Sequence, residues 1–293
     1  MSPHRIRPFL FTASALTVLA CDKPREAAVT PHAAVAAAPP AVAAFRVPEM
    51  SELKDSAMRL SAARGRAILE ATRDSLPHNV GNSLRCVSCH FAAGTARNAM
   101  PWVGVYSRFP QFRPRSGRVD LLEDRINDCF ERSLNGRALR TDSREMRDIV
   151  AYMAFLSIGV PAGSTISGQS VPKLEKLVSD SARGAVVFAT ECGRCHGAAG
   201  QGSALAPPLW GPKSYNNGAG MSRIGMLASF AHQLMPLDKP GSLTPQQYYD
   251  VAAYVNSRPR PDFPGRAKDF PGGNAPGDLG YPVKRGAGNL APH

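Results

Sequence analysis

Apolar residues recur at helical spacing in two pairs of segments, and the two pairs follow the same order along the chain. The first pair covers residues 51–75 and the stretch around 148–153, and the second covers 174–192 and the stretch around 250–255. Residues three and four positions apart share one face of a helix, so each segment is predicted to be a helix. No strand-type alternation runs far enough to predict a sheet.

The second pair repeats the first. The earlier helix of each pair contains Ala-Arg-Gly, at 63–65 and 182–184, and the later helix contains an Asp followed by a largely apolar run with a Tyr. The chain is therefore predicted to be an internal duplication. Its length of 293 residues also suits two domains.

Capping signals mark the start of both closing helices. Thr244, Pro245 and Gln247 supply an N-cap, a first-turn proline and the reciprocal acceptor of a capping box. Asp142 and Glu145 have the same spacing before the first closing helix.

Composition separates the two domains from the segments around them. The domains are predicted at 50–160 and 173–262, joined by a linker of small and polar residues at 161–172. Residues 21–49, rich in Ala, Pro and Val, are predicted to be a tether. Residues 263–293, rich in Pro and Gly, are predicted to be an irregular or disordered tail.

Residues 1–20 have the pattern of an export signal. Arg5 and Arg7 precede an apolar run that is too short to span a bilayer. The run ends in Val-Leu-Ala before Cys21, which resembles a bacterial lipoprotein cleavage box and predicts lipidation of Cys21. The alternative is cleavage after Ala20 and a secreted protein. Lipidation predicts anchoring on the periplasmic side of a bacterial membrane.

Two Cys-x-x-Cys-His runs carry the candidate chemistry. This spacing is typical of c-type haem attachment, in which two thiols one helical turn apart bind the haem and the adjacent histidine ligates its iron. A zinc or thioredoxin-type site is the alternative, but the histidine follows directly both times and no βαβ pattern surrounds either run. Two covalently bound haem c groups are therefore predicted, on Cys86, Cys89 and His90 and on Cys192, Cys195 and His196.

The layout resembles class I cytochrome c in both halves. Gly184, Phe188, the second haem motif with Gly197, Met235 before a proline and the helix of Tyr254 match that family's pattern. The resemblance implies an all-α fold with two tandem class I cytochrome c-like domains, each around one haem.

The ligand opposite each histidine decides much of what a haem does. Met235 lies 39 residues after His196 and is the predicted ligand of the second haem, with Met221, Met226 and His232 as alternatives. A thioether ligand raises the reduction potential and suits electron transfer.

The first domain carries a different sulfur at the equivalent position. Cys129, which no other motif uses, lies 39 residues after His90. We therefore predict that the Cys129 thiolate ligates the first haem opposite His90. The alternatives are Met100 as the ligand and a merely structural, buried role for Cys129.

The residues around Cys129 suggest an anion site. Asp120 and Glu123 have capping-box spacing, so a helix is predicted over 121–135, ended by Gly136. The predicted apolar stripe of that helix consists of Leu122, Ile126 and Phe130.

Arg125, Cys129 and Ser133 are spaced four residues apart beside this stripe and so share one helix face. A guanidinium one turn from a thiol favours the thiolate and can also hold an anion. A Pro-rich loop that could fold over the same pocket carries three more arginines, Arg113, Arg115 and Arg118. The formal charge of +12 agrees with a small anionic substrate, whereas nucleic acid is not expected as a partner of an exported haem protein.

Residues 111–136 and 214–221 resemble the dihaem thiosulfate dehydrogenases, and the resemblance spans about 50–262. Members of that family join two thiosulfate ions into tetrathionate at a His/Cys-ligated first haem, and their second haem passes electrons to an external acceptor. The resemblance assigns the active-site cysteine to Cys129, the substrate-holding arginines to Arg115 and Arg125, and the serine to Ser133.

Two features depart from this family pattern. Some members carry lysine before the ligating methionine as an alternative ligand, whereas this chain has Leu234 there. The lipid anchor on Cys21 departs from soluble periplasmic members. A pure electron carrier, a subunit of a sulfur-oxidising complex and a dihaem peroxidase are the other functions considered.

Overall fold

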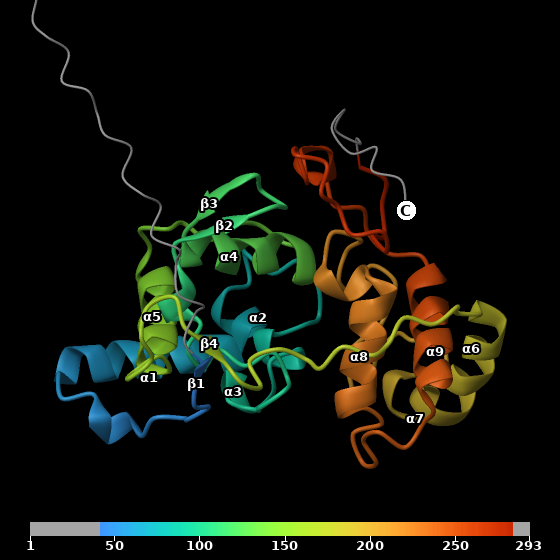
Figure 1. Cartoon of the computed structure of the whole chain (residues 1–293), viewed down its shortest axis with the longest axis horizontal. Coiled ribbons are helices and arrows are strands. Elements are labelled where there is room, and N and C mark those ends of the chain that lie inside the picture. The colour runs from blue at the N-terminus through green and yellow to red at the C-terminus, as the bar shows by residue number, and fades with distance from the viewer. Residues whose placement is uncertain (1–41, 284–293) are drawn as a thin grey trace, which may run out of the picture. The chain divides into compact units, whose positions relative to one another are not determined.

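The computed structural model describes residues 42–283 (Figure 1). The predicted signal peptide 1–20, Cys21 and most of the predicted tether lie outside this range, as does 284–293. Within the described range, no helix combines the length and the apolar character that a membrane crossing requires.

The first half is built on the packing of α1 (Ser56–Glu70) against α5 (Arg144–Phe155). Three shorter helices stand between them in the chain, namely α2 (Thr72–Ser75), α3 (Phe91–Gly94) and α4 (Leu122–Asp128). A π-helical turn, η4 (Cys129–Ser133), continues α4, and three 3₁₀ turns complete the half: η1 (Met50–Glu52), η2 (Cys86–Ser88) and η3 (Tyr106–Arg108).

The second half repeats this plan with α6 (Ser181–Val187) against α9 (Pro245–Ser257) and α8 (Ile224–Leu234) beside α9 (Figure 1). A π-helical turn, η5 (Phe188–Cys192), leads from α6 into α7 (Gly193–His196). Two 3₁₀ turns follow, η6 (Gly220–Ser222) and η7 (Arg266–Lys268). The fold is thus mostly helical, as predicted.

Two small sheets were not predicted. Strand β1 (Val42–Ala43) pairs in parallel with β4 (Thr165–Ile166), and β2 (Gln111–Arg113) pairs antiparallel with β3 (Arg118–Asp120). Strands of two or three residues are too short to give a readable alternation, which explains why the pattern did not reveal them.

The Ala-Arg-Gly repeat marks the helix crossing in both halves. A Cβ on Gly65 would lie 1.9 Å from the Asp148 carbonyl oxygen, and one on Gly184 would lie 2.0 Å from the Asp250 carbonyl oxygen. Only glycine permits this close approach. The arginine before each glycine binds the same aspartate: Arg64 Nε lies 2.7 Å from Asp148 Oδ2, and Arg183 Nε lies 2.7 Å from Asp250 Oδ2.

These two aspartates are buried yet ionised. Burial alone would raise the pKa of Asp148, but its hydrogen bonds from Arg64 and Ser61 outweigh burial and the pKa is lowered. Asp250 has a lowered pKa for the same reason, with Arg183 as the main donor against the effect of burial. The duplicated motif therefore joins a close helix contact to a buried ion pair.

The observed helix starts correct several predictions. Helix α1 begins at Ser56, where Asp55 caps the Met58 N–H, rather than at 51. Helix α6 begins at Ser181, where Asp180 accepts from Ala182 and Arg183, rather than at 174. The capping signal of α9 at Thr244 is confirmed.

The predicted cap of α5 was wrong by one residue. Ser143, not Asp142, accepts the hydrogen bond from the Met146 N–H. Asp142 instead forms an exposed ion pair with Arg140 at 2.7 Å. The spacing of acidic residues alone does not distinguish adjacent capping candidates.

The predicted linker and the described part of the predicted tail are both packed against the rest of the chain. In 161–172, Ile166 and Val171 are buried, and Gln169 donates to the Val103 carbonyl at 2.8 Å. The described part of the predicted tail, 263–283, has little regular structure but is not disordered, because Phe263, Phe270 and Tyr281 are buried.

Candidate active site

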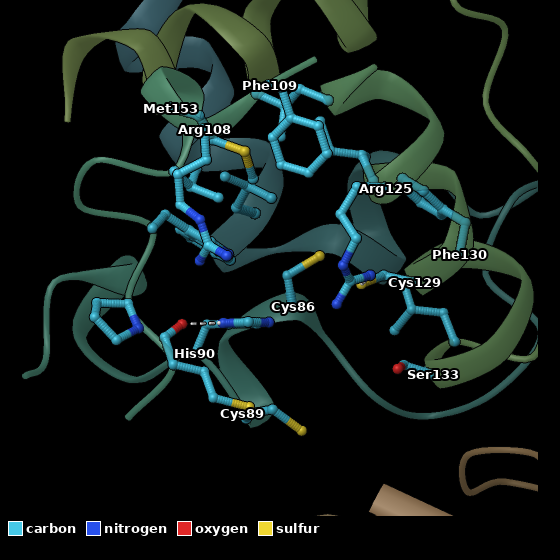
Figure 2. Close-up of a pocket in the computed structure, with 18 of the residues that line it drawn as sticks. Cys86, Cys89, His90, Arg108, Phe109, Arg125, Cys129, Phe130, Ser133 and Met153 are labelled. Atoms are coloured by element: carbon cyan, nitrogen blue, oxygen red, sulfur yellow. Dashed lines mark hydrogen bonds between the residues drawn. The ribbon is translucent and has the colours of Figure 1, made fainter. Parts of the chain in front are cut away.

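One cavity in the first half brings the haem motif and Cys129 together (Figure 2). It encloses about 1160 Å³, its open mouth included. Its lining includes the predicted site residues Cys86, Cys89, His90, Arg125, Cys129 and Ser133. Its apolar lining residues include Leu69, Leu84, Trp102, Leu122, Ile126 and Phe130.

His90 is oriented for iron ligation. Its Nδ1 lies 2.5 Å from the Met100 carbonyl oxygen, a bond drawn in Figure 2, so Nε2 is left to bind a metal. Burial lowers the pKa of His90 to about 4, which keeps the imidazole neutral as a ligand must be. The two thiols, the free Nε2 and the apolar walls fit a covalently bound haem.

The same contact bears on the competing ligand Met100. Its carbonyl oxygen lies beside His90 Nδ1, and Met100 lines the same cavity as Cys129. Cys129 as the ligand opposite His90, with Met100 as the alternative, stays a prediction.

The second haem motif has the same local geometry. His196 Nδ1 lies 2.8 Å from the Pro207 carbonyl oxygen, and burial lowers the pKa of His196. Cys192 ends η5 and Cys195 lies in α7, so the motif begins where the π-helical turn passes into α7.

Met235 caps the C-terminal end of α8 and is half-buried, and its carbonyl accepts a hydrogen bond from Tyr248 at 2.7 Å. His232, one of its rivals, packs edge-on against the Tyr248 ring at 5.2 Å. Met235 as the ligand of the second haem stays a prediction.

Cys129 lies where α4 passes into the π-helical turn. The Arg125 Nη1 lies 3.0 Å from the Cys129 sulfur. The Cys129 sulfur raises the pKa of Arg125, although burial of the guanidinium acts in the opposite direction. The predicted apolar stripe, which runs from α4 into η4, is confirmed, because Leu122, Ile126 and Phe130 are all buried.

The predicted helix over 121–135 was right in place and wrong in detail. Its cap is not Asp120: the Asp124 side chain accepts from the Leu121 N–H at 2.9 Å, and Asp120 is buried in an ion pair with Arg118 at 3.1 Å. Regular α-helix ends at Asp128, the π-helical turn ends at Ser133, and Asn135 has a positive φ of 45°.

The arginines of the Pro-rich loop divide into three environments. Arg113 lines the cavity, whereas Arg118 is exposed and binds Asp120 and Asp124. Arg115 is not among the lining residues; its Nη1 donates to the Gly218 carbonyl at 2.7 Å and its guanidinium lies over the Phe270 ring. A guanidinium has five N–H donors, so the predicted substrate role of Arg115 stays a prediction.

Arg113 was the residue that sequence reasoning underrated. Gln111 and Arg113 line the cavity from β2, while Phe112 between them is 60% exposed. Burial and the neighbouring Arg125 charge lower the pKa of Arg113, so two cations converge on one site. Arg113 ends β2, whereas Arg115 lies in the turn between β2 and β3, and the sequence pattern did not distinguish the two positions.

Arg108 adds a third cation to the lining. Figure 2 shows the side chains of Arg108 and Arg125 reaching into the space over His90 from opposite sides, with Ser133 beyond Cys129. A cavity with two thiols, a histidine, a free cysteine and several guanidinium groups can hold a haem together with a small anion.

Comparison with known proteins decides the family. Residues 78–162 match the SoxA/TsdA cytochrome c domain, and residues 181–259 match the cytochrome c domain. A thiosulfate dehydrogenase from Allochromatium vinosum is 45% identical over 236 residues, covering 77% of this chain and 87% of that protein. The chain belongs to the thiosulfate dehydrogenase family.

Other members agree with this assignment. A thiosulfate dehydrogenase from Psychrobacter arcticus is 39% identical, covering 80% of this chain and 74% of that protein. The solved thiosulfate dehydrogenase TsdBA from Marichromatium purpuratum matches with a TM-score of 0.71 and 35% identity, covering 75% of this chain. This chain spans half the length of that solved chain. The two matched cytochrome c domains indicate two haem c groups.

Proposed function

We propose that this chain joins two thiosulfate ions into tetrathionate at the cavity of the first half. One sulfur–sulfur bond forms between the outer sulfurs of the two ions, no bond breaks, and two electrons leave. When bound, the two haem groups provide the one-electron centres that accept these electrons. His90 and Cys129 would hold the first haem iron and His196 and Met235 the second.

The contact between Arg125 and Cys129 carries this proposal. A generic electron-transfer cytochrome has no need for a guanidinium 3.0 Å from a cysteine sulfur inside its haem cavity. Arg125 donates to the Cys129 sulfur and has further N–H donors with which to hold a thiosulfate beside that sulfur.

Charge compensation is the main task of the cavity. Two dianions must approach each other, and each pair of unit charges about 4 Å apart repels by about 4 kcal/mol at an effective dielectric of 20. The cations on Arg113 and Arg125 offset this repulsion. The Arg113 Nε is buried without a hydrogen-bond partner among the described residues, since its ion pair with Asp120 is 3.8 Å long.

Ser133, at the end of the π-helical turn, is placed to orient the bound thiosulfate. The Ser133 carbonyl accepts a hydrogen bond from Asn82 at 2.8 Å, which fixes the backbone from which the hydroxyl reaches the cavity. We infer that this hydroxyl donates to a thiosulfate oxygen and that Arg115 adds positive charge from the edge of the site.

The cellular setting follows from the sequence. We infer that the chain is exported by residues 1–20, works in the periplasm and is held at a membrane by a lipid on Cys21. Electrons would leave through the second half to an external redox protein.

The direct test is product formation by the purified holoprotein. With thiosulfate and ferricyanide we expect tetrathionate and reduced acceptor in a ratio of one to two. Arg125→Ala should abolish most of this turnover, whereas Arg140→Ala, which removes an arginine with an 81% exposed side chain, should not. Turnover in neither direction, forward from thiosulfate or backward from tetrathionate, would contradict the proposal and leave an electron carrier.

A further inference from the structure

The segment 263–283, called here the C-terminal strap, is packed against the turn that carries Cys129 (Figure 1, red end of the described chain). The central contact is a buried ion pair 137 residues apart in the chain. Arg132 Nη1 and Nη2 lie 2.7 and 2.8 Å from the two carboxylate oxygens of Asp269. Their side chains are only 10% and 5% exposed.

Other groups hold this pair in place. The Arg132 guanidinium lies 3.9 Å from the centre of the Phe263 ring, and its Nε donates to Asp128 at 3.1 Å. The Tyr281 hydroxyl donates to Asp269. A bidentate arginine–carboxylate pair fixes orientation as well as distance. Two residues of the strap, Phe263 and Asp269, therefore hold the Arg132 side chain in one orientation.

Arg132 lies between the two functional residues of the π-helical turn. Cys129 and Ser133 face the cavity, whereas the Arg132 side chain is bound by the strap. A π-helical turn inside a helix is rare and frequently lies at a functional site. Its carbonyls accept hydrogen bonds: Asn216 Nδ2 binds the Glu131 carbonyl at 2.8 Å, and the Asn216 N–H binds the Arg132 carbonyl at 3.2 Å.

The strap also fixes the loop that precedes α4. The Phe270 N–H donates to the Arg115 carbonyl at 2.8 Å, and the Phe270 ring lies under the Arg115 guanidinium at 5.4 Å. The strap therefore contacts both segments that supply the predicted anion-binding residues, α4 with its π-helical turn and the Pro-rich loop.

We propose that Asp269 is a positioning residue of the active site, which sets the place of Cys129 and Ser133 through Arg132. The strap then belongs to the catalytic unit rather than to a loose tail. The activity part of this inference rests on the proposed function, but the placement of Cys129 is independent of the substrate.

The experiment compares holoprotein variants by two readouts. Electron paramagnetic resonance reports whether thiolate ligates the ferric first haem, and steady-state kinetics with thiosulfate separates kcat from KM. Asp269→Asn removes the charge that binds Arg132. The matched control is Asp278→Asn, which breaks another ion pair of the strap, with Arg223 at 2.8 Å, in the second half.

For Asp269→Asn we expect part of the thiolate signal to change to another form while the second haem signal stays as it is. We expect kcat to fall about ten- to a hundredfold with a smaller change in KM, since a misplacement of roughly 1 Å can have this effect. Asp269→Glu should recover part of both, and Asp278→Asn should change neither. An unaltered thiolate signal and kcat in Asp269→Asn would overturn the proposal.

Tyr281→Phe is a milder second variant, which keeps the proposal testable if Asp269→Asn does not fold. It removes one hydrogen bond to Asp269 and leaves the ion pair, so a smaller change in the same two readouts is expected, and no change in either would overturn the proposal. The thiolate signal of Asp269→Asn could change while the wild-type protein forms no tetrathionate. That result would distinguish the positioning role of Asp269 from the proposed function. Positioning would then stand and the proposed function would fail.

Discussion

At the scale of single residues, the neighbour of Cys129 is as important as its position in the chain. The Arg125 guanidinium lies 3.0 Å from the Cys129 sulfur and places a positive charge beside it inside the cavity. The same charge can hold an anionic substrate next to the sulfur.

Substitution of Arg125 by lysine tests this double role. Lysine keeps the positive charge but loses the fork that reaches the sulfur and the anion together. Losing a hydrogen bond to a charged group removes about 1.5–3 kcal/mol, so kcat/KM for thiosulfate should fall roughly ten- to a hundredfold. Steady-state assays with ferricyanide measure it. Arg140→Lys, at an exposed site, serves as the control, and equal kcat/KM in both variants would contradict the role of the fork.

At the scale of elements, each half depends on one close helix crossing. The glycine at the crossing and the arginine before it act on the same aspartate of the closing helix, at Asp148 in one half and Asp250 in the other. The duplication thus preserved a packing device, while the positions that face the haem diverged.

Gly65→Ala should destabilise the first half. Its Cβ would lie 1.9 Å from a backbone oxygen, so α1 and α5 must separate. Overpacking of this kind typically takes away about 1–3 kcal/mol, and at about 2–4 °C per kcal/mol the melting temperature should fall by several degrees. Thermal unfolding followed by circular dichroism measures the change. Gly272→Ala is the control, since a Cβ there meets nothing within 4 Å; equal melting temperatures would refute the close-crossing argument.

Local signals predicted the elements well and the long-range contacts poorly. The Thr244 cap and the apolar stripe of α4 follow from neighbouring residues, and both are confirmed. Asp120 and Asp142 do not cap helices, because each forms an ion pair with a nearby arginine instead. The strap could not be predicted, because its burial depends on Arg132, which lies 137 residues from Asp269.

The candidate site shows the same division. The haem motifs and the face shared by Arg125, Cys129 and Ser133 are readable from spacing. Arg113 lines the cavity and Arg115 does not, because of the short β2–β3 pairing. No local sequence pattern predicted this pairing.

At the scale of the whole molecule, the positive charge should guide the substrate. The chain carries a formal net charge of +12, and thiosulfate is a dianion. Clefts lined by one sign of charge raise the rate at which an opposite ion arrives.

The kcat/KM for thiosulfate should therefore decrease with salt. Between about 0.01 and 0.15 M ionic strength the screening length falls from about 30 to 8 Å, and a decrease of several-fold, up to roughly tenfold, is expected. The assay uses sodium chloride at limiting thiosulfate and saturating acceptor, with sucrose as an uncharged control. A flat salt profile would show that long-range attraction plays no part.

The contact between Arg132 and Asp269 also affects how a purified sample should be judged. Both haem motifs and Cys129 precede residue 263, so a chain that lacks the strap would keep every residue predicted to hold the two haems. Such a chain would look like a complete dihaem cytochrome by its colour, yet the turn that carries Cys129 would lack the ion pair with Asp269. Haem absorbance alone would therefore not separate a truncated chain from one that is able to turn over.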